Sequence, residues 1–288
     1  MKTQKPNFIG ALLLSVAFVI FGFASETFPQ CGVDSTLSNS ETTDRILKSA
    51  RQAMEKSEKI GNIQGWSSFW QTQEAMSDDV RASSEIQESI QLPNRFKKVT
   101  SRNYGTNIIV STSILDGSVG KTTSENFVNG VPLQLETEPR KFDTKKTAMR
   151  LARTLSFELL PILLDTAPGS YYTFEYIGKA QSDSGKAYIL KATGKTGETY
   201  QLFFDQSLCR LLMMTSERSV KIPPRQPGNE KAIQSIKRNT FFSDYKEADG
   251  LVIAHRIVIE ENGKTIYEQT LKKFEVNPKF KTNTFKVD

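Results

Sequence analysis

The chain has 288 residues, of which 38% are hydrophobic and 24% are charged, and this composition excludes a disordered or collagen-like chain. The length allows one large domain or two small ones, and it is sufficient for a hydrophobic core that does not depend on disulfides or bound metal. The 38 basic and 32 acidic residues leave a mild net charge of +6, which disfavours a dedicated nucleic-acid site, and one histidine with two cysteines excludes the common zinc sites.

The N-terminus has the organisation of a secretory signal peptide. Lys2 and Lys5 precede an apolar run over Phe8–Phe21, and the Gly22–Ala24 segment supplies the small residues of a cleavage site. An uncleaved membrane anchor is the alternative, but the run is shorter than the ~20 apolar residues that a spanning helix needs. We therefore expect residues 1–24 to be removed and the product to be soluble and periplasmic or secreted.

Residues 25–40 are small, polar and without periodicity, so they predict a flexible leader before a domain that spans residues 41–288. Ser40 is the expected N-cap of a first helix, and Gly61 is its expected end. The apolar positions of this helix recur at helical spacing and predict packing on a sheet; they are Ile46, Ala50, Ala53, Met54 and Ile60.

After Gly61 the hydrophobic period changes from that of a helix to that of a strand. From Ala82 to Leu92 the even positions read Ala, Ser, Ile, Glu, Ile, Leu, and the odd positions are polar, which is typical of a half-buried strand. Asp116-Gly117 and Asn129-Gly130 are typical hairpin turns. The strands predicted in this part of the chain are Gln64–Gln73, Ala82–Leu92, Ile108–Ile114, Val119–Thr123, Glu125–Val128 and Val131–Leu135.

A second helix is predicted from Asp143 to Leu164. Its first half is amphipathic, whereas residues 157–164 are apolar on nearly every side and must be buried or lie over an apolar opening. Pro161 should kink or end this helix. We expect its second half to cover the open side of the sheet as a lid, through Leu159, Leu160, Leu163 and Leu164.

The rest of the chain returns to strands. We expect Gly178 to end the first of them, residues 218–237 to form a surface loop or linker, and Asn262-Gly263 to form a two-residue hairpin. The predicted strands are Tyr171–Lys179, Lys186–Thr193, Thr199–Asp205, Cys209–Glu217, Thr240–Lys246, Leu251–Glu260 and Lys264–Val276. Together these segments predict a mainly antiparallel β fold with α. We expect a single curved sheet of about ten or eleven strands that forms an incomplete barrel and is covered by two helices.

Aromatic side chains share faces of two of these strands. Tyr172, Phe174 and Tyr176 lie on one face of the first strand, and Tyr200, Leu202 and Phe204 share a face of another. Such stripes are typical of ordinary core as well as of a ligand cavity. One curved sheet with only two helices leaves part of its concave face to be filled or to bind a ligand, and this favours a cavity. The candidate cavity and lid residues are Leu159, Leu160, Leu163, Leu164, Tyr172, Phe174, Tyr176, Leu202, Phe204 and Met213.

The sequence contains no recognisable catalytic constellation. His255 is the only histidine, and a strand histidine at a sheet surface or cavity wall explains it better than a general base does. The glycines lie at hairpin turns rather than in a phosphate-binding loop. We therefore expect neither an enzyme nor a cofactor nor a metal site, with a hydrolase that uses an unconventional carboxylate site as the distant alternative.

Cys31 and Cys209 are the only two cysteines. A disulfide between them is chemically allowed in an oxidising compartment, and the leader that carries Cys31 could reach the strand that contains Cys209. The alternative is that Cys209 is a small buried hydrophobic residue. The sequence leaves both possibilities open.

The closing segment resembles the C-terminal signature of the outer-membrane lipoprotein-sorting family. The resemblance lies in Phe242–Leu251 (FSDYKEADGL), His255–Ile257 and Phe274–Pro278 (FEVNP), and it is supported by Gln91–Phe96 (QLPNRF) and Leu202–Gln206 (LFFDQ). The order helix, strands, helix, strands also matches that family from about residue 41 to residue 285.

This resemblance implies a half-open antiparallel barrel with an apolar concave face that helices cover. It also implies a periplasmic carrier or chaperone for the acyl chains of lipoproteins or for lipids, with transient membrane contact and envelope proteins as further partners. The alternative is a cell-envelope scaffold that uses the same sheet for protein contacts and has a filled core. No nucleic-acid partner is expected.

Overall fold

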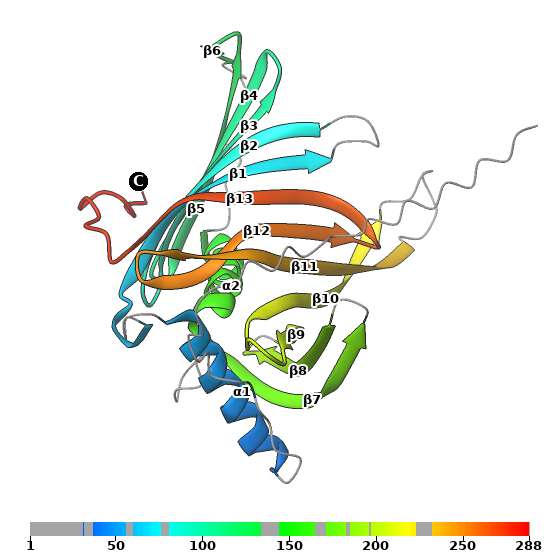
Figure 1. Cartoon of the computed structure of the whole chain (residues 1–288). Helices are drawn as coiled ribbons and strands as arrows, with labels where there is room; N and C mark the ends of the chain where they lie inside the picture. The colour runs from blue at the N-terminus through cyan, green and yellow to red at the C-terminus, as the bar shows by residue number, and fades with distance from the viewer. Residues whose placement is uncertain are drawn as a thin grey trace, which may run out of the picture.

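The computed structural model describes residue 31 and residues 37–55, 60–75, 81–133, 144–164, 171–182, 185–195, 197–222 and 232–287. The predicted signal peptide and most of the predicted leader lie outside these residues. The described part of the chain contains one large sheet, two α-helices and a short 3-10 turn (Figure 1).

All thirteen strands belong to one antiparallel sheet, whose spatial order is β6-β5-β4-β3-β2-β1-β13-β12-β11-β10-β9-β8-β7. The two end strands do not pair with each other, so the sheet curves without closing (Figure 1). The predicted fold class is therefore confirmed. The strands are β1 Gly65–Ala75, β2 Arg81–Gln91, β3 Arg95–Tyr104, β4 Asn107–Asp116, β5 Val119–Val128, β6 Val131–Pro132, β7 Tyr172–Ser182, β8 Gly185–Gly194, β9 Thr199–Asp205, β10 Leu211–Ile222, β11 Ala232–Ala248, β12 Leu251–Glu261 and β13 Lys264–Val276.

The hairpin turns are confirmed by their backbone angles. Asn129 and Gly130 both have positive φ, and so do Asn262 and Gly263, as a type I′ turn requires. The strands that these turns join, β5 with β6 and β12 with β13, pair as direct neighbours. The bounds predicted for β9 and β13 agree with the structure.

Five details of the strand prediction are wrong. The strand β3 was not predicted, and β5 is one strand where two were expected. Residues 218–237 are not a loop throughout, because β10 extends to Ile222 and β11 starts at Ala232. Gly178 does not end β7; it takes a positive φ at a register shift, and the strand continues to Ser182. Cys209 lies in the turn before β10, also with positive φ.

Helix α1 spans Asn39–Met54 and starts earlier than predicted. Ser38, not Ser40, is the N-cap, because its hydroxyl accepts from the Glu41 backbone while the Glu41 carboxylate accepts from the Ser38 backbone. The helix ends at Met54, since Glu55 is already extended and pairs with Leu251. The expected end at Gly61 is therefore wrong.

Helix α2 spans Thr144–Leu163 and passes through Pro161 before it ends. Its apolar face packs on β5 at a point of close approach: a Cβ atom on Gly120 would lie 2.7 Å from the Cα of Ala148. A glycine at this position is what allows the helix to reach the strand. Neither described helix is long and apolar enough to cross a bilayer.

Two hydrophobic clusters hold the helices against the concave face of the sheet. In the first, Ile46, Leu47 and Ala50 of α1 are buried against the β7–β10 end, where Leu190, Leu202 and Phe204 are fully buried. In the second, Leu151 and Leu155 of α2 pack with a cross-strand row at the β1–β4 end. That row consists of Trp66, Ile90, Phe96 and Leu115, which lie opposite one another in successive strands.

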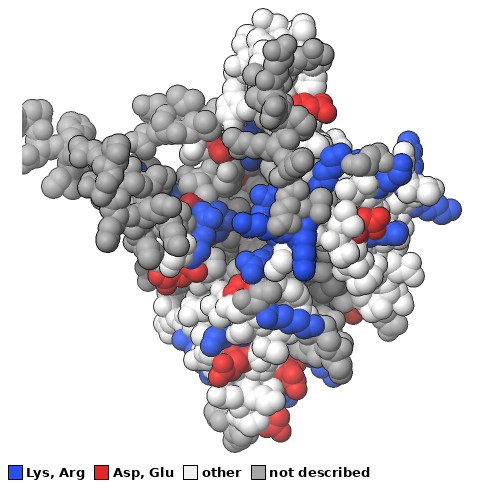
Figure 2. Space-filling view, turned by 180° about the vertical axis from the view of Figure 1, so that it is seen from behind, with Lys and Arg blue, Asp and Glu red and all other residues white. Residues whose placement is uncertain are grey.

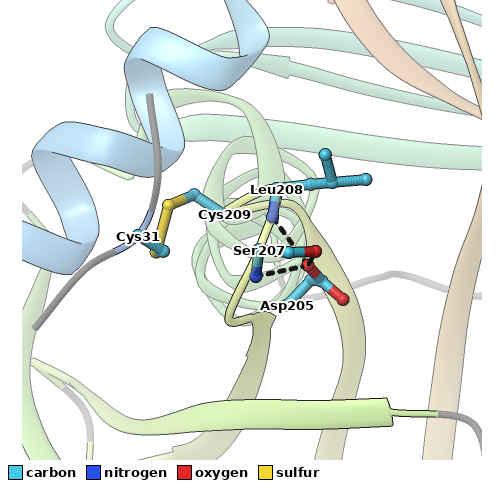
Figure 3. The surroundings of a disulfide bond; sticks show 5 residues. All are labelled: Cys31, Asp205, Ser207, Leu208 and Cys209. Atoms are coloured by element: carbon cyan, nitrogen blue, oxygen red, sulfur yellow. Dashed lines mark hydrogen bonds between the residues drawn. A yellow bond between two sulfur atoms is a disulfide. The ribbon is translucent and has the colours of Figure 1, made fainter. Parts of the chain in front are cut away.

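A disulfide joins Cys31 to Cys209, whose Cα atoms are 5.2 Å apart (Figure 3). Both cysteines are buried within the first hydrophobic cluster. The turn that presents Cys209 is fixed by Asp205, whose Oδ1 accepts from the backbone N–H groups of Ser207 at 2.8 Å and Leu208 at 2.6 Å. The leader is thus attached covalently to the β9–β10 turn.

Candidate functional site

A cavity of about 1160 Å³ lies between α2 and the concave face of the sheet. It occupies the space between the two hydrophobic clusters, so neither helix fills it. Its wall is largely apolar, and its principal apolar members are Trp66, Trp70, Phe157, Phe242, Ile257 and Phe274. The cavity is therefore the strongest candidate for a ligand site in the described part of the chain.

Both tryptophans of the chain contribute to this wall. Trp66 and Trp70 lie four residues apart on β1, so they project from the same face of the sheet. The ring of Trp66 packs at 6.4 Å from that of Phe274 on β13, between centroids. The Trp70 indole N–H donates to the Ser68 hydroxyl at 3.0 Å, which fixes its orientation.

A polar row crosses the otherwise apolar floor. Ser68, Glu88 and Lys98 lie directly opposite one another on β1, β2 and β3. The Lys98 Nζ lies 2.7 Å from Glu88 Oε1, and the Ser68 hydroxyl donates to Glu88 Oε2 at 3.0 Å. Glu88 is buried with both carboxylate oxygens occupied. The register of β2 and β3 therefore brings the two members of this ion pair together, and β1 adds the hydroxyl that holds Glu88.

Helix α2 adds a second carboxylate to this row. Lys98 Nζ donates to Glu158 Oε1 at 3.2 Å, so one ammonium is shared by two carboxylates and connects α2 to the sheet. Burial alone lowers the pKa of Lys98, but the charges of Glu158 and Glu88 outweigh it and hold that pKa above its usual value. Burial raises the pKa of Glu158, and Glu88 raises it further against the opposing effect of Lys98.

The raised pKa of Glu158 predicts a pH-dependent stability difference between the wild type and Glu158→Gln. A raised folded-state pKa contributes stability below the unfolded pKa of about 4.3, and this contribution is lost as pH rises through the folded value. The free energy of unfolding of the wild type should therefore fall relative to that of the variant over this window, by at most about 1.4 kcal/mol per pH unit.

Urea unfolding from pH 4.5 to pH 8 measures this difference. Glu175→Gln, on the exposed side of β7, is the control for loss of one negative charge. A wild type that gains stability over Glu158→Gln as pH rises would contradict the assignment, because it would mean that Lys98 stabilises the Glu158 anion more than burial destabilises it.

Basic side chains gather where the cavity opens, and Figure 2 shows Lys and Arg concentrated in the middle of this face of the molecule. We call this group the cationic mouth; it consists of Lys146, Arg150 and Arg153 of α2 with Arg218 of β10 and Arg238 of β11. Tyr200 lies between the mouth and the apolar wall. Its ring is 5.8 Å from that of Phe157, and Arg153 and Arg238 both oppose the effect of burial, which raises the Tyr200 pKa.

None of the ten residues predicted for the cavity and lid is among those that line this cavity. Six lie elsewhere in the fold as buried core or its margin: Leu160, Leu164, Tyr172, Leu202 and Phe204 are buried in the first cluster, and Leu159 packs on the second. Phe174 and Tyr176 are half-buried against the first cluster, and Met213 is half-buried on β10. The side chain of Leu163 lies outside the described residues. Their role as ligand contacts stays a prediction.

One feature of the sequence indicates the polar row in the cavity wall, namely a charged residue on the inward face of β2. Glu88 occupies an even position of β2, the face on which Ala82, Ile86 and Ile90 are buried. A charged residue on an inward face needs a buried partner, because an unpaired charge there is too costly. Lys98 could not be chosen as that partner without the β2–β3 register, and Glu158 could not be chosen without the position of α2.

The described residues show no site with the features of a metal centre or a catalytic triad. No group of three His, Cys, Asp or Glu side chains among them could hold a metal ion. The ring Nδ1 of His255 lies 3.1 Å from the backbone oxygen of Ile253 on its own strand. Glu88 and Glu158 both accept from Lys98, which fits charge neutralisation better than an acid–base pair.

No family model and no curated protein matches the chain. Solved structures of similar shape include an outer membrane lipoprotein-sorting protein domain from Vibrio parahaemolyticus, with 10% identity and a TM-score of 0.43 over 83% of this chain and 94% of that chain. A DUF1329 family protein from Desulfovibrio piger has 9% identity and a TM-score of 0.45 over 85% of this chain and 97% of that chain. A LolA superfamily protein from Nitrosomonas europaea has 11% identity and a TM-score of 0.44 over 83% of this chain and 97% of that chain.

Proposed function

We propose that the protein is a periplasmic carrier that holds the acyl chain of a lipoprotein or lipid in the cavity between α2 and the sheet. The observation that carries this proposal is the cavity itself, with a volume of about 1160 Å³ and a largely apolar wall. This volume is at the upper end of the roughly 300–1,000 Å³ typical of small-molecule sites. The expected signal peptide and the disulfide both support an oxidising compartment outside the cytoplasm.

An apolar cavity that stays open to water is unfavourable unless something fills it. Phe157, Ile257 and Phe274 border the cavity and keep part of their surface exposed. Covering such surface by a hydrocarbon chain recovers about 25 cal/mol per Å² of apolar area. A scaffold with a filled core would need no such volume, so the cavity favours the carrier over that alternative.

The two tryptophans offer a direct test of acyl-chain entry. Bromine atoms quench indole fluorescence at short range, so a fatty acid brominated in mid-chain should quench Trp66 and Trp70 if its chain enters the cavity. We expect saturable quenching by 9,10-dibromostearate, and none by stearate itself. The proposal would be refuted if dibromostearate does not quench the tryptophans and stearate does not displace a fluorescent fatty acid from the protein.

Ile257→Asp should weaken this binding at least tenfold. Ile257 lines the cavity, and an aspartate there places a charge beside the hydrocarbon chain, which costs more than about 1.4 kcal/mol. Val258→Asp is the matched control, because the next residue of β12 is not part of the cavity wall. Melting temperatures of both variants establish that they fold. If Ile257→Asp and Val258→Asp are quenched equally, the acyl chain does not bind in the described cavity.

A further inference from the structure

The cationic mouth carries more positive than negative charge. Its five basic groups face Glu198 and Glu217 of the cavity lining, together with Glu261, which accepts from Arg218 at 3.1 Å and from Arg238. Two of the remaining cations belong to one exposed stripe of α2. Arg150 donates only to the Thr122 hydroxyl, at 3.2 Å, and Arg153 makes no ion pair within the described part of the chain.

The charges are arranged in line with the apolar wall. Along α2 the cavity-lining residues recur at helical spacing, and they change in kind along the helix: Lys146, Arg150 and Arg153 are followed by Phe157 and Pro161. The cavity-facing side of α2 therefore carries its basic groups in the N-terminal half, and its C-terminal half presents apolar surface together with Glu158, whose charge is paired with Lys98. A ligand that matches it has an anionic end and a hydrocarbon end.

Tyr200 lies at the boundary between the basic part and the apolar part of the cavity. Its ring packs at 5.8 Å from that of Phe157 on one side, and its hydroxyl lies near the charges of Glu198, Arg153 and Arg238 on the other. These two arginines come from α2 and from β11, so they approach the boundary from opposite walls of the cavity. An anionic group that stops at Tyr200 would have a guanidinium on each side while its chain continues toward Trp66 and Trp70.

We infer that the ligand is an anionic amphiphile whose phosphate-bearing headgroup sits in the cationic mouth while its acyl chain occupies the apolar part of the cavity. This inference rests on the proposed carrier function and specifies its substrate class. Guanidinium groups bind phosphate oxygens in a bidentate manner, which suits the arginine-rich composition of the mouth. A zwitterionic headgroup offers the same phosphate beside a cation that the basic groups repel, so it gains less from this arrangement than a headgroup of net negative charge.

Two lysophospholipids with the same mid-chain dibrominated acyl group test the inference, one with a phosphoglycerol headgroup of net negative charge and one with a zwitterionic phosphocholine headgroup. Tryptophan quenching is titrated with each below its critical micelle concentration. We expect the anionic lipid to bind the wild type about tenfold more tightly at low salt, and this preference to shrink as salt is added.

Arg153→Gln should reduce that preference threefold or more, with only a smaller loss of affinity for the phosphocholine lipid. Lys145→Gln is the matched control, because it removes one positive charge from an exposed position of the same helix that does not line the cavity. Equal affinities of the wild type for both lipids, with normal quenching, would overturn the headgroup inference and leave the carrier intact. No quenching by either lipid would refute the carrier and the inference together.

Inorganic phosphate alone separates a headgroup site from a site for a free anion. At matched ionic strength it should leave the melting temperature of the wild type unchanged. A phosphate-dependent rise that Arg153→Gln abolishes, combined with equal affinity for the two lipids, would assign the mouth to a free anion and reject the amphiphile.

Discussion

Replacing Lys98 by methionine is expected to lower the free energy of unfolding by about 3 kcal/mol, because it leaves two carboxylates without their shared cation. Glu88 is buried and would keep only the Ser68 hydroxyl, and Glu158 would lose the one hydrogen bond that connects it to the sheet. Equilibrium unfolding in urea at pH 7 measures this loss.

Two further variants separate the ion pair from the side chain itself. Lys97→Met changes the neighbouring residue of β3, which makes no ion pair among the described residues, and should shift stability by less than about 0.5 kcal/mol. Combining Lys98→Met with Glu88→Gln and Glu158→Gln removes both carboxylate charges and should recover most of the loss. If the triple variant is as unstable as Lys98→Met, the cost comes from packing and not from uncompensated charge.

Loss of the disulfide should destabilise the protein by about 2–5 kcal/mol. Cys31 and Cys209 are 178 residues apart in the sequence, and a crosslink that closes a long loop restricts the unfolded chain strongly. The double variant Cys31→Ala/Cys209→Ala removes the bond without leaving a free thiol. Its melting temperature, compared with that of the oxidised wild type, reports the effect.

Reduction provides the control for the cysteine substitutions. Dithiothreitol should lower the melting temperature of the wild type to about that of the double variant, and it should leave the double variant unchanged. A wild type that is insensitive to the reductant, and whose two thiols are both alkylated without it, would show that the bond does not form in solution.

Much of the fold could be predicted because its signals are local. Asn262-Gly263 predicts a hairpin since both residues accept a positive φ, and the alternation in β2 predicts a strand with one buried face. The second helix was recognisable from its apolar periodicity, and Pro161 so near its C-terminus does not prevent the helix from continuing for two more residues.

The features that sequence could not reveal depend on distant partners. The strand β3 was missed because Lys98 lies on its inward face between Phe96 and Thr100, and this breaks the pattern expected of a half-buried strand. Its charge is acceptable there only because β2 and α2 each supply a carboxylate. Long-range compensation of this kind leaves no local trace.

The candidate residues named from the sequence do not line the described cavity, for a related reason. Tyr172, Leu202 and Phe204 do share concave faces, but α1 covers that end of the sheet and incorporates them into its core. The cavity lies instead beneath the side of α2 that carries Phe157 and Arg153. Periodicity identifies which residues face inward; it does not identify which inward-facing residues a helix covers.

The unclosed sheet has a consequence for the behaviour of the protein at high concentration. A sheet that does not close has two edges, and a long straight edge can pair with the edge of a second copy and start aggregation. At one end β6 has only two residues and pairs only with Phe127 and Val128, so β5 forms most of that edge. At the other end β7 is interrupted by the register shift at Gly178 and carries the exposed charges of Glu175 and Lys179. At the β7 end, therefore, the open sheet does not present a continuous template for edge-to-edge association.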